Sequence, residues 1–193
     1  YTTGIWNDIH FIEMEFMDAG NMWSLMEDGR KPVELATAAP LMLQMLEGLA
    51  YAHAVELTVT TKTGDRKVTG TIHRDLKPTN VLLKQGKNGL VAKLSDFGLA
   101  KSFGAAGCTQ ATITRDQGVC GTPHYMAPEH VTLYKYVEPP TDVFEMAATM
   151  THILTGKTVR PIKRGQDPFK VVLEVRPRPF KELMPKCSEA FAE

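Results

Sequence analysis

Residues 73–80 read HRDLKPTN, and a DFG tripeptide begins at Asp96. The first stretch supplies a carboxylate at Asp75, an amine at Lys77 and a carboxamide at Asn80, all within six residues. Asp96 adds a second carboxylate further along the chain. Two carboxylates, an amine and an amide oxygen so close in sequence indicate a site for handling charge and metal, not a packing surface.

Phosphoryl transfer needs these four groups. Its transition state spreads negative charge over phosphate oxygens, so a protein mainly positions groups and neutralises charge. A carboxylate must orient the attacking hydroxyl, and a cation must stand near the transferred phosphate. Mg²⁺ is a hard ion that prefers carboxylate and amide oxygens. We therefore interpret Asp75, Lys77, Asn80 and Asp96 as a phosphoryl-transfer set.

A third motif, GTPHYMAPE at residues 121–129, follows the other two in order. With these three motifs the chain resembles eukaryotic-type serine/threonine protein kinases. The resemblance implies the kinase-like α+β fold, mainly the helical large lobe together with the last strands of the small lobe. It covers nearly the whole chain, and several strings, such as GQDPFKVVLE at residues 165–174, are similar to bacterial members of the family.

The resemblance assigns roles to single residues. Asp75 would be the catalytic base or hydroxyl-orienting group, and Lys77 would steady the γ-phosphate. Asn80 and Asp96 would bind Mg²⁺ and thereby ATP. Thr122 would bridge toward Asp75 and Lys77 and help to seat the substrate.

Further roles follow from the same resemblance. Met14 stands at the gatekeeper position, and the backbone of Glu15 and Met17 would meet the adenine edge of ATP. His73 is expected to be structural, and Arg74 would receive an activation-loop phosphate. For that phosphate we consider three threonines, without choosing among them: Thr109, Thr112 and Thr114.

The resemblance also predicts a partial domain over residues 1–193, with the end of the small lobe and the hinge at 1–17 and the large lobe at 18–193. The family's glycine-rich loop, phosphate-gripping lysine and partner glutamate do not occur in this sequence. Glu129 is expected to be buried without its usual arginine partner. We therefore expect residues 1–193 alone to bind ATP poorly and to turn over little.

Around the motifs, local patterns predict the secondary structure. A buried strand is expected over Ile9–Met17, then a short helix capped by Asn21. An amphipathic helix should bury one face made of Leu35, Ala38, Ala39, Met42, Met45, Leu46, Leu49 and His53. Residues 57–70 predict an exposed hairpin.

Downstream, short strands are expected at residues 81–83 and 92–94, and a long loop at 99–122. A helix apolar all round should run from Asp142 to Thr155 and stop at Gly156. We expect Phe144, Glu145 and Ala147, which stand where the family often has Trp, Ser and Gly, to be tolerated. Six methionines fit an ordinary core better than a metal-binding or partner-binding surface: Met14, Met17, Met22, Met26, Met42 and Met45.

Composition limits the alternatives. The 193 residues carry 22 Lys plus Arg and 22 Asp plus Glu, which argues against a nucleic-acid-binding surface as the main function. Three cysteines without CxxC spacing argue against a zinc site or a disulfide framework and favour a reducing, cytoplasmic setting.

Protein substrates bearing Ser or Thr and ATP are the expected partners, with no membrane contact from this segment and no prediction of oligomeric state. Two alternatives stay open: a pseudokinase scaffold that binds partners without turnover, and a small-molecule phosphotransferase. The intact Asp75, Asn80 and Asp96 argue against the first. The GTPHYMAPE segment and the position of Lys77 argue against the second.

Overall fold

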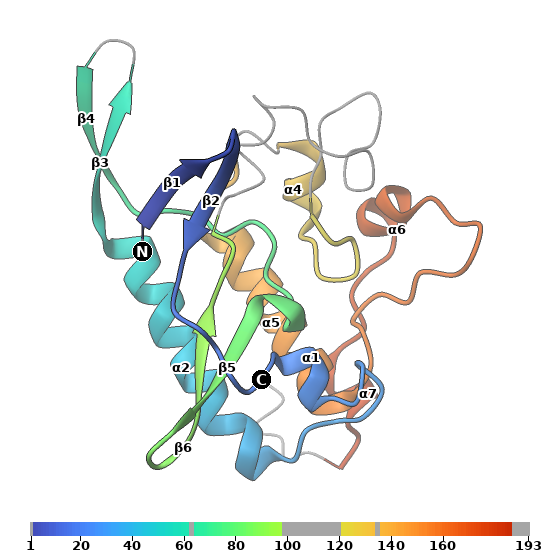
Figure 1. The fold of residues 1–193 in the computed structure, drawn as a ribbon. Helices are drawn as coiled ribbons and strands as arrows, with labels where there is room; N and C mark the ends of the chain where they lie inside the picture. The colour runs from blue at the N-terminus through green and yellow to red at the C-terminus, as the bar shows by residue number, and fades with distance from the viewer. Residues whose placement is uncertain (1, 62–63, 98–120, 134–135, 187–193) are drawn as a thin grey trace.

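The computed structural model describes residues 2–61, 64–97, 121–133 and 136–186. The two longest helices of the described residues are α2 (Leu35–Ala54) and α5 (Pro139–Thr155), which pack against each other. The hairpin of β5 (Val81–Gly86) and β6 (Gly89–Leu94) lies along α2, and Figure 1 shows α5 behind it. The protein kinase-like α+β arrangement predicted from the sequence is confirmed.

The first strands differ from the prediction. β1 (Thr2–Trp6) pairs antiparallel with β2 (Ile9–Glu13), so the expected strand stops at Glu13. All five residues of β2 are exposed, and the expectation of a buried strand is wrong for the described residues. An extended segment then leads to Ala19, whose N–H donates to the Leu83 carbonyl at 3.0 Å. This bond, together with that from Leu83 N to Gly20 O, ties the segment to the edge of β5.

Helix α1 (Met22–Leu25) begins as predicted, because the Asn21 side chain accepts a hydrogen bond from Ser24 N at 3.0 Å. For α2, the predicted element is confirmed but its predicted face is partly wrong. The buried residues are Ala38, Leu41, Met45, Leu49 and Ala52, while Leu35 and Leu46 are exposed. Nearly every position of this helix is apolar, so periodicity alone does not select the buried stripe.

The central core joins α1, α2, the β5–β6 hairpin and α5. Its largest buried members are Met22, Met26, Leu41, Met45, Leu76, Leu83, Met146 and Ile153. Three of the six methionines noted in the sequence, Met22, Met26 and Met45, are thus fully buried, and Met42 packs against the core. Met14 is 48% exposed, so the core interpretation is wrong for that residue.

A second hairpin projects away from the body at the end of α2 (Figure 1). Its strands are β3 (Glu56–Thr61) and β4 (Gly64–Thr69), which confirms the predicted hairpin. Gly70 returns the chain with φ of +75°, and a Cβ at this position would lie 2.4 Å from the His53 carbonyl oxygen. Only glycine fits this close approach of two backbones.

Helix α5 begins at Pro139, three residues before the predicted start at Asp142, and it stops at Gly156 as predicted. Gly156 adopts the left-handed conformation that commonly ends a helix. The expectation of apolar positions all round is wrong, because five polar residues of α5 are buried: Thr141, Asp142, Glu145, Thr149 and His152. The 3₁₀ turn η1 (Pro78–Asn80) precedes β5. The short helix α4 (Pro128–Thr132) begins within the GTPHYMAPE motif, and two further short helices lie after α5: α6 (Pro168–Glu174) and α7 (Phe180–Leu183). In the described residues no helix is long and apolar enough to cross a membrane.

Candidate active site

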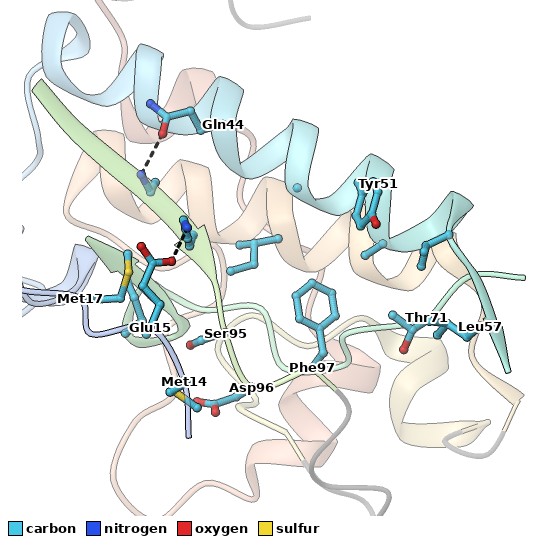
Figure 2. Close-up of a pocket in the computed structure, with 17 residues that line it drawn as sticks. Met14, Glu15, Met17, Gln44, Tyr51, Leu57, Thr71, Ser95, Asp96 and Phe97 are labelled. Atoms are coloured by element: carbon cyan, nitrogen blue, oxygen red, sulfur yellow. Dashed lines mark hydrogen bonds and ion pairs between the residues drawn. The ribbon is translucent and has the colours of Figure 1, made fainter. Parts of the chain in front are cut away.

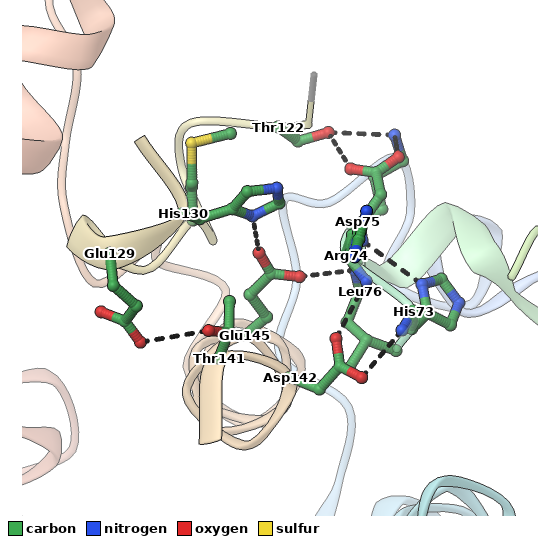
Figure 3. A network of polar contacts seen from close by, with 12 residues as sticks. His73, Arg74, Asp75, Leu76, Thr122, Glu129, His130, Thr141, Asp142 and Glu145 are labelled. Carbon is green, nitrogen blue, oxygen red and sulfur yellow. Dashed lines mark hydrogen bonds and ion pairs between the residues drawn. The ribbon is translucent and has the colours of Figure 1, made fainter. Parts of the chain in front are cut away.

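Three polar side chains from two distant segments meet in a triangle. The Lys77 Nζ lies 2.5 Å from Asp75 Oδ2 and 2.9 Å from Thr122 Oγ1, and the Thr122 hydroxyl donates to Asp75 Oδ1 at 2.8 Å. The side chains of Asp75 and Lys77 are about a quarter exposed, at 25% and 24%. The structure therefore brings together a partly exposed charged pair and a hydroxyl that is 45 residues away from Lys77. Figure 3 shows Thr122 beside Asp75.

Asn80 extends the triangle toward the strands. Its Nδ2 donates to the Asp75 carbonyl at 2.8 Å, and its backbone carbonyl accepts from Ser95 N at 2.9 Å. Asn80 is 7% exposed, at the end of the 3₁₀ turn that feeds β5. The amide nitrogen is engaged, and the side-chain oxygen accepts one long contact from Thr79 Oγ1 at 3.5 Å, so this oxygen is the group able to face a cation.

Asp96 follows the end of β6 and has a positive φ of 63°. Residues other than glycine adopt this conformation rarely, and they cluster at functional sites when they do. The Asp96 side chain lines a cavity of about 670 Å³ together with Ser95 and Phe97 (Figure 2). Asn80 and Asp96 thus offer two oxygen donors, and in the described residues no cluster of three or more His, Cys, Asp or Glu is arranged to hold a metal. This donor set fits Mg²⁺, which is commonly held by one or two side chains, waters and substrate phosphates.

The same cavity is lined by the three residues predicted at the adenine site: Met14, Glu15 and Met17. The Glu15 side chain reaches two lysines of the β5–β6 hairpin, accepting from Lys84 Nζ at 2.8 Å and from Lys93 Nζ. The Lys84 hydrogen bond first, and the Lys93 bond next, lower the pKa of Glu15 to about 2. These ion pairs fix the linker after β2 (residues 14–19) against the β5–β6 hairpin. This hairpin directly follows the loop at residues 73–80, which we call the catalytic loop because of the role predicted for it.

The rest of the cavity is formed by α2, the base of the β3–β4 hairpin and the β5–β6 hairpin, including Gln44, Gly48, Tyr51, Ala52, Leu57, Thr71, Leu82, Ala92 and Leu94. Gln44 was not singled out in the sequence. Its Oε1 accepts from Ala92 N at 2.9 Å and thereby attaches α2 to β6. A lone glutamine within an apolar helix was the available signal.

His73 is placed as expected for a structural residue. It is 1% exposed, its Nε2 lies 2.8 Å from the Ser95 carbonyl, and its ring contacts Phe97 with centroids 4.6 Å apart. Burial lowers the pKa of His73. A neutral ring with hydrogen on Nε2 satisfies both nitrogens, because Nδ1 then accepts from Asp75 N at 3.3 Å.

Helix α5 holds the backbone of the catalytic loop through hydrogen bonds to Asp142. Asp142 is fully buried, and its carboxylate accepts from His73 N at 2.8 Å, from Arg74 N at 2.9 Å and from His53 Nε2 at 2.8 Å. Arg74 has a φ of +69°, an unfavourable conformation for this residue type that the bond to Asp142 stabilises. This arrangement fixes the backbone immediately before Asp75 (Figure 3).

Two residues of the GTPHYMAPE segment, Glu129 and Tyr125, correct or extend the sequence analysis. Glu129 was expected to be buried without a partner, but it is only partly buried, and Thr141 Oγ1 donates to it at 3.4 Å. The Tyr125 hydroxyl lies 2.8 Å from His152 Nδ1, and His152 Nε2 lies 3.2 Å from the Gly29 carbonyl. Burial lowers the pKa of His152, which agrees with a neutral ring that accepts from Tyr125 and donates to Gly29. The threonines proposed as phosphorylation sites lie outside the described residues.

Comparison with known proteins agrees with this geometry. The sequence profile of the protein kinase domain matches residues 5–189. A probable serine/threonine-protein kinase of Streptomyces coelicolor is 31% identical over 172 residues, which are 89% of this chain and 22% of that protein. Serine/threonine-protein kinase ATG1c of Arabidopsis thaliana is 39% identical over 150 residues, 78% of this chain and 17% of that protein. Serine/threonine-protein kinase pkn2 of Myxococcus xanthus is 31% identical over 144 residues, 75% of this chain and 15% of that protein. The chain spans about a fifth of the length of these relatives.

Proposed function

Since this chain belongs to the protein kinase domain family, we propose that the protein of which it is part transfers the γ-phosphate of ATP to Ser or Thr hydroxyls of protein substrates. The observation that carries the proposal is the triangle of Asp75, Lys77 and Thr122, next to the donor pair Asn80 and Asp96. The names of the relatives support the serine/threonine class.

In the proposed mechanism, Asp75 orients the substrate hydroxyl and receives its proton. One oxygen of Asp75 accepts from Thr122, which fixes the carboxylate plane while the substrate hydroxyl approaches. Lys77, paired with Asp75 here, would turn its ammonium to the γ-phosphate once the nucleotide is bound. The distance between Lys77 Nζ and Asp75 Oδ2 is short and both side chains are partly buried, so the ammonium stays near Asp75 and near the proposed position of the γ-phosphate.

Mg²⁺, when bound, would neutralise the charge that develops on the phosphate oxygens. We propose that Asn80 Oδ1 and the Asp96 carboxylate hold it. The Asn80 amide orientation is set by its bond to the Asp75 carbonyl, so the backbone of the proposed base positions the side chain of the proposed metal ligand. Met14, Glu15 and Met17 would form the adenine end of the same cavity.

We further propose that residues 1–193 do not carry the complete ATP site. The described small-lobe part is the β1–β2 hairpin and the linker to Ala19, and the sequence contains no glycine-rich phosphate loop. Assays of the reaction therefore need the full-length protein, and the isolated segment should show far lower ATP affinity than the full-length protein does.

The test is Asp75→Asn in the full-length protein, assayed with labelled ATP, Mg²⁺ and a Ser/Thr-containing protein substrate. Asparagine keeps the shape but cannot take the proton, so turnover should fall by roughly 10²–10⁴-fold. Asp167→Asn, at an exposed helix N-cap, is the matched control and should leave turnover unchanged. Transfer at the wild-type rate by Asp75→Asn would refute the assignment of the base. A wild-type protein that transfers no phosphate under these conditions would favour the scaffold alternative.

A further inference from the structure

Glu145 is a buried residue of α5 that contacts both the loop carrying Asp75 and the helix α4 that follows Thr122. Its Oε2 accepts from Leu76 N at 3.1 Å, and its Oε1 lies 2.6 Å from His130 Nδ1. Leu76 is the residue between Asp75 and Lys77, and His130 belongs to α4, directly after the GTPHYMAPE segment. Glu145 is 2% exposed and His130 is 0% exposed (Figure 3).

These contacts of Glu145 complete a closed ring of neighbouring residues that includes Asp75 and Thr122. The His130 ring lies close to Gly121: a Cβ added to Gly121 would lie 3.4 Å from His130 Cε1. Gly121 precedes Thr122, whose hydroxyl donates to Asp75 Oδ1. The ring consists of these links in order. Asp75 is bonded to Leu76 along the chain, Leu76 N donates to Glu145, and Glu145 contacts His130. His130 lies against Gly121, which precedes Thr122, and Thr122 donates to Asp75.

Glu145 belongs to a polar stripe on the buried side of α5. Asp142, Glu145 and Thr149 stand at helical spacings of three and four, on one face. Asp142 accepts from the backbone of His73 and Arg74, Glu145 accepts from Leu76 N, and Thr149 Oγ1 donates to Leu76 O at 3.0 Å. Both polar groups of the Leu76 peptide are therefore satisfied by α5.

Burying Glu145 is costly, and burial is the first cause that raises the pKa of this carboxyl, whereas the His130 hydrogen bond lowers it. Serine, the common family residue at this position, would be too short to span between α4 and the catalytic loop. Oε2 can accept from Leu76 whether or not the pair with His130 is ionised. The geometry of the loop therefore does not depend on where that proton resides.

We propose that Glu145 is a positioning residue that, together with His130, sets the distance between the substrate-seating segment at Thr122 and the catalytic loop at Asp75. This inference rests on the proposed kinase function but concerns residues that the family motifs do not include. Loss of the carboxylate should release the Leu76 peptide and α4 from each other and displace Thr122 relative to Asp75. The proposed nucleotide and Mg²⁺ contacts of the linker and of Asp96 lie outside the catalytic loop and should remain. Lys77 and Asn80 belong to the same loop as Asp75, so their places relative to the nucleotide should change less than that of Thr122.

The experiment uses Glu145→Ala and Glu145→Gln in the full-length protein, with Glu47→Gln, at an exposed position on α2, as the matched control. For Glu145→Ala we expect kcat to fall about 10- to 100-fold, the range expected when a reacting group is displaced by about 1 Å. The KM for ATP should change less than about twofold, because uniform binding of the nucleotide is not touched. In Glu145→Gln the carboxamide oxygen still accepts from Leu76, so kcat should recover to within about threefold of wild type.

Hydrogen exchange of the Leu76 amide, followed by NMR, gives a readout that does not depend on activity. It should be at least about tenfold faster in Glu145→Ala and close to wild type in Glu145→Gln. His130→Ala tests the two contacts of Glu145 separately. It removes the contact with α4 but leaves the Glu145 oxygen that accepts from Leu76 N in place. Here kcat should fall while Leu76 exchange stays at the wild-type rate, and the double variant should lose no more kcat than the larger single loss.

The possible outcomes are distinguishable. A folded Glu145→Ala with wild-type kcat, or with wild-type exchange at Leu76, overturns the proposal, as does a loss of kcat fully accounted for by a smaller folded fraction. If Glu145→Ala does not fold, Glu145→Gln and His130→Ala carry the test on their own. An inactive wild-type protein would refute the proposed function, and the exchange measurements would still decide whether Glu145 holds Leu76.

Discussion

Replacing Asp142 with Asn measures how strongly α5 holds the catalytic loop. The wild-type carboxylate is buried and accepts three hydrogen bonds, two of them from consecutive backbone N–H groups. An asparagine offers one oxygen and one NH₂ group, so its nitrogen must face one of the N–H donors. A buried donor without an acceptor costs about 1–3 kcal/mol, and a lost hydrogen bond to a charged group costs about 1.5–3 kcal/mol.

These two contributions together predict a destabilisation of about 2.5–6 kcal/mol. The positive φ of Arg74 points the same way, because this conformation persists only while its surroundings enforce it. The matched control is Asp167→Asn, where the side chain accepts from Phe169 N at 2.9 Å at an exposed N-cap. Asn and Asp are about equally good at this position, so we expect a change below about 0.5 kcal/mol.

The assay is urea denaturation of the full-length protein, with unfolding of this segment followed by hydrogen exchange on its own peptides. Both variants change one carboxylate to a carboxamide, so the difference between them isolates burial and hydrogen bonding. If the free energies of unfolding of Asp142→Asn and Asp167→Asn differ by less than about 1 kcal/mol, the three hydrogen bonds do not stabilise the loop as argued.

Two further predictions concern the ends of the site. Gly70→Ala places a Cβ 2.4 Å from a backbone oxygen of α2 and should lower the melting temperature clearly more than Gly165→Ala, where φ is also positive but the space is open; equal shifts would contradict the steric argument. Glu15→Gln removes the ion pairs to Lys84 and Lys93, which lower the pKa of Glu15 to about 2. A lowered pKa stabilises the fold above the ordinary value of 4.5, and this contribution is lost as the pH falls toward 2, so the stability gap between wild type and variant should narrow from about pH 6 to about pH 3. An unchanged gap in denaturation curves across that range would show that these ion pairs do not stabilise the linker.

The closeness in space of the proposed catalytic residues is the feature that the sequence predicted best. Asp75, Lys77 and Asn80 fall within one short loop, and the β5–β6 hairpin brings Asp96 back beside them, so few conformational choices remain. Thr122 is far away in sequence. Its placement could be expected only through the family resemblance, and the structure brings its hydroxyl to Asp75.

The buried faces of the helices were harder to predict. In α2 almost every residue is apolar, and the choice of Leu41 over Leu46 as a core residue is made by β6 and α5, which pack against it. In α5 the apolar residues suggested core on all sides. The pattern that mattered was the polar one, because Asp142, Glu145 and Thr149 share a face, and a polar stripe on a buried helix needs partners.

Those partners explain why a buried helix carries polar residues at all. An apolar helix would drive collapse equally well, and replacing buried charges by apolar side chains is often neutral or stabilising. It would, however, leave the N–H groups of His73, Arg74 and Leu76 buried without acceptors, since these loop residues form no regular secondary structure. Apolar packing around Met146 and Ile153 holds α5 in the core, while its polar stripe supplies the hydrogen bonds that an irregular loop cannot make by itself. The same helix thus stabilises the domain and determines the conformation of the loop that carries Asp75.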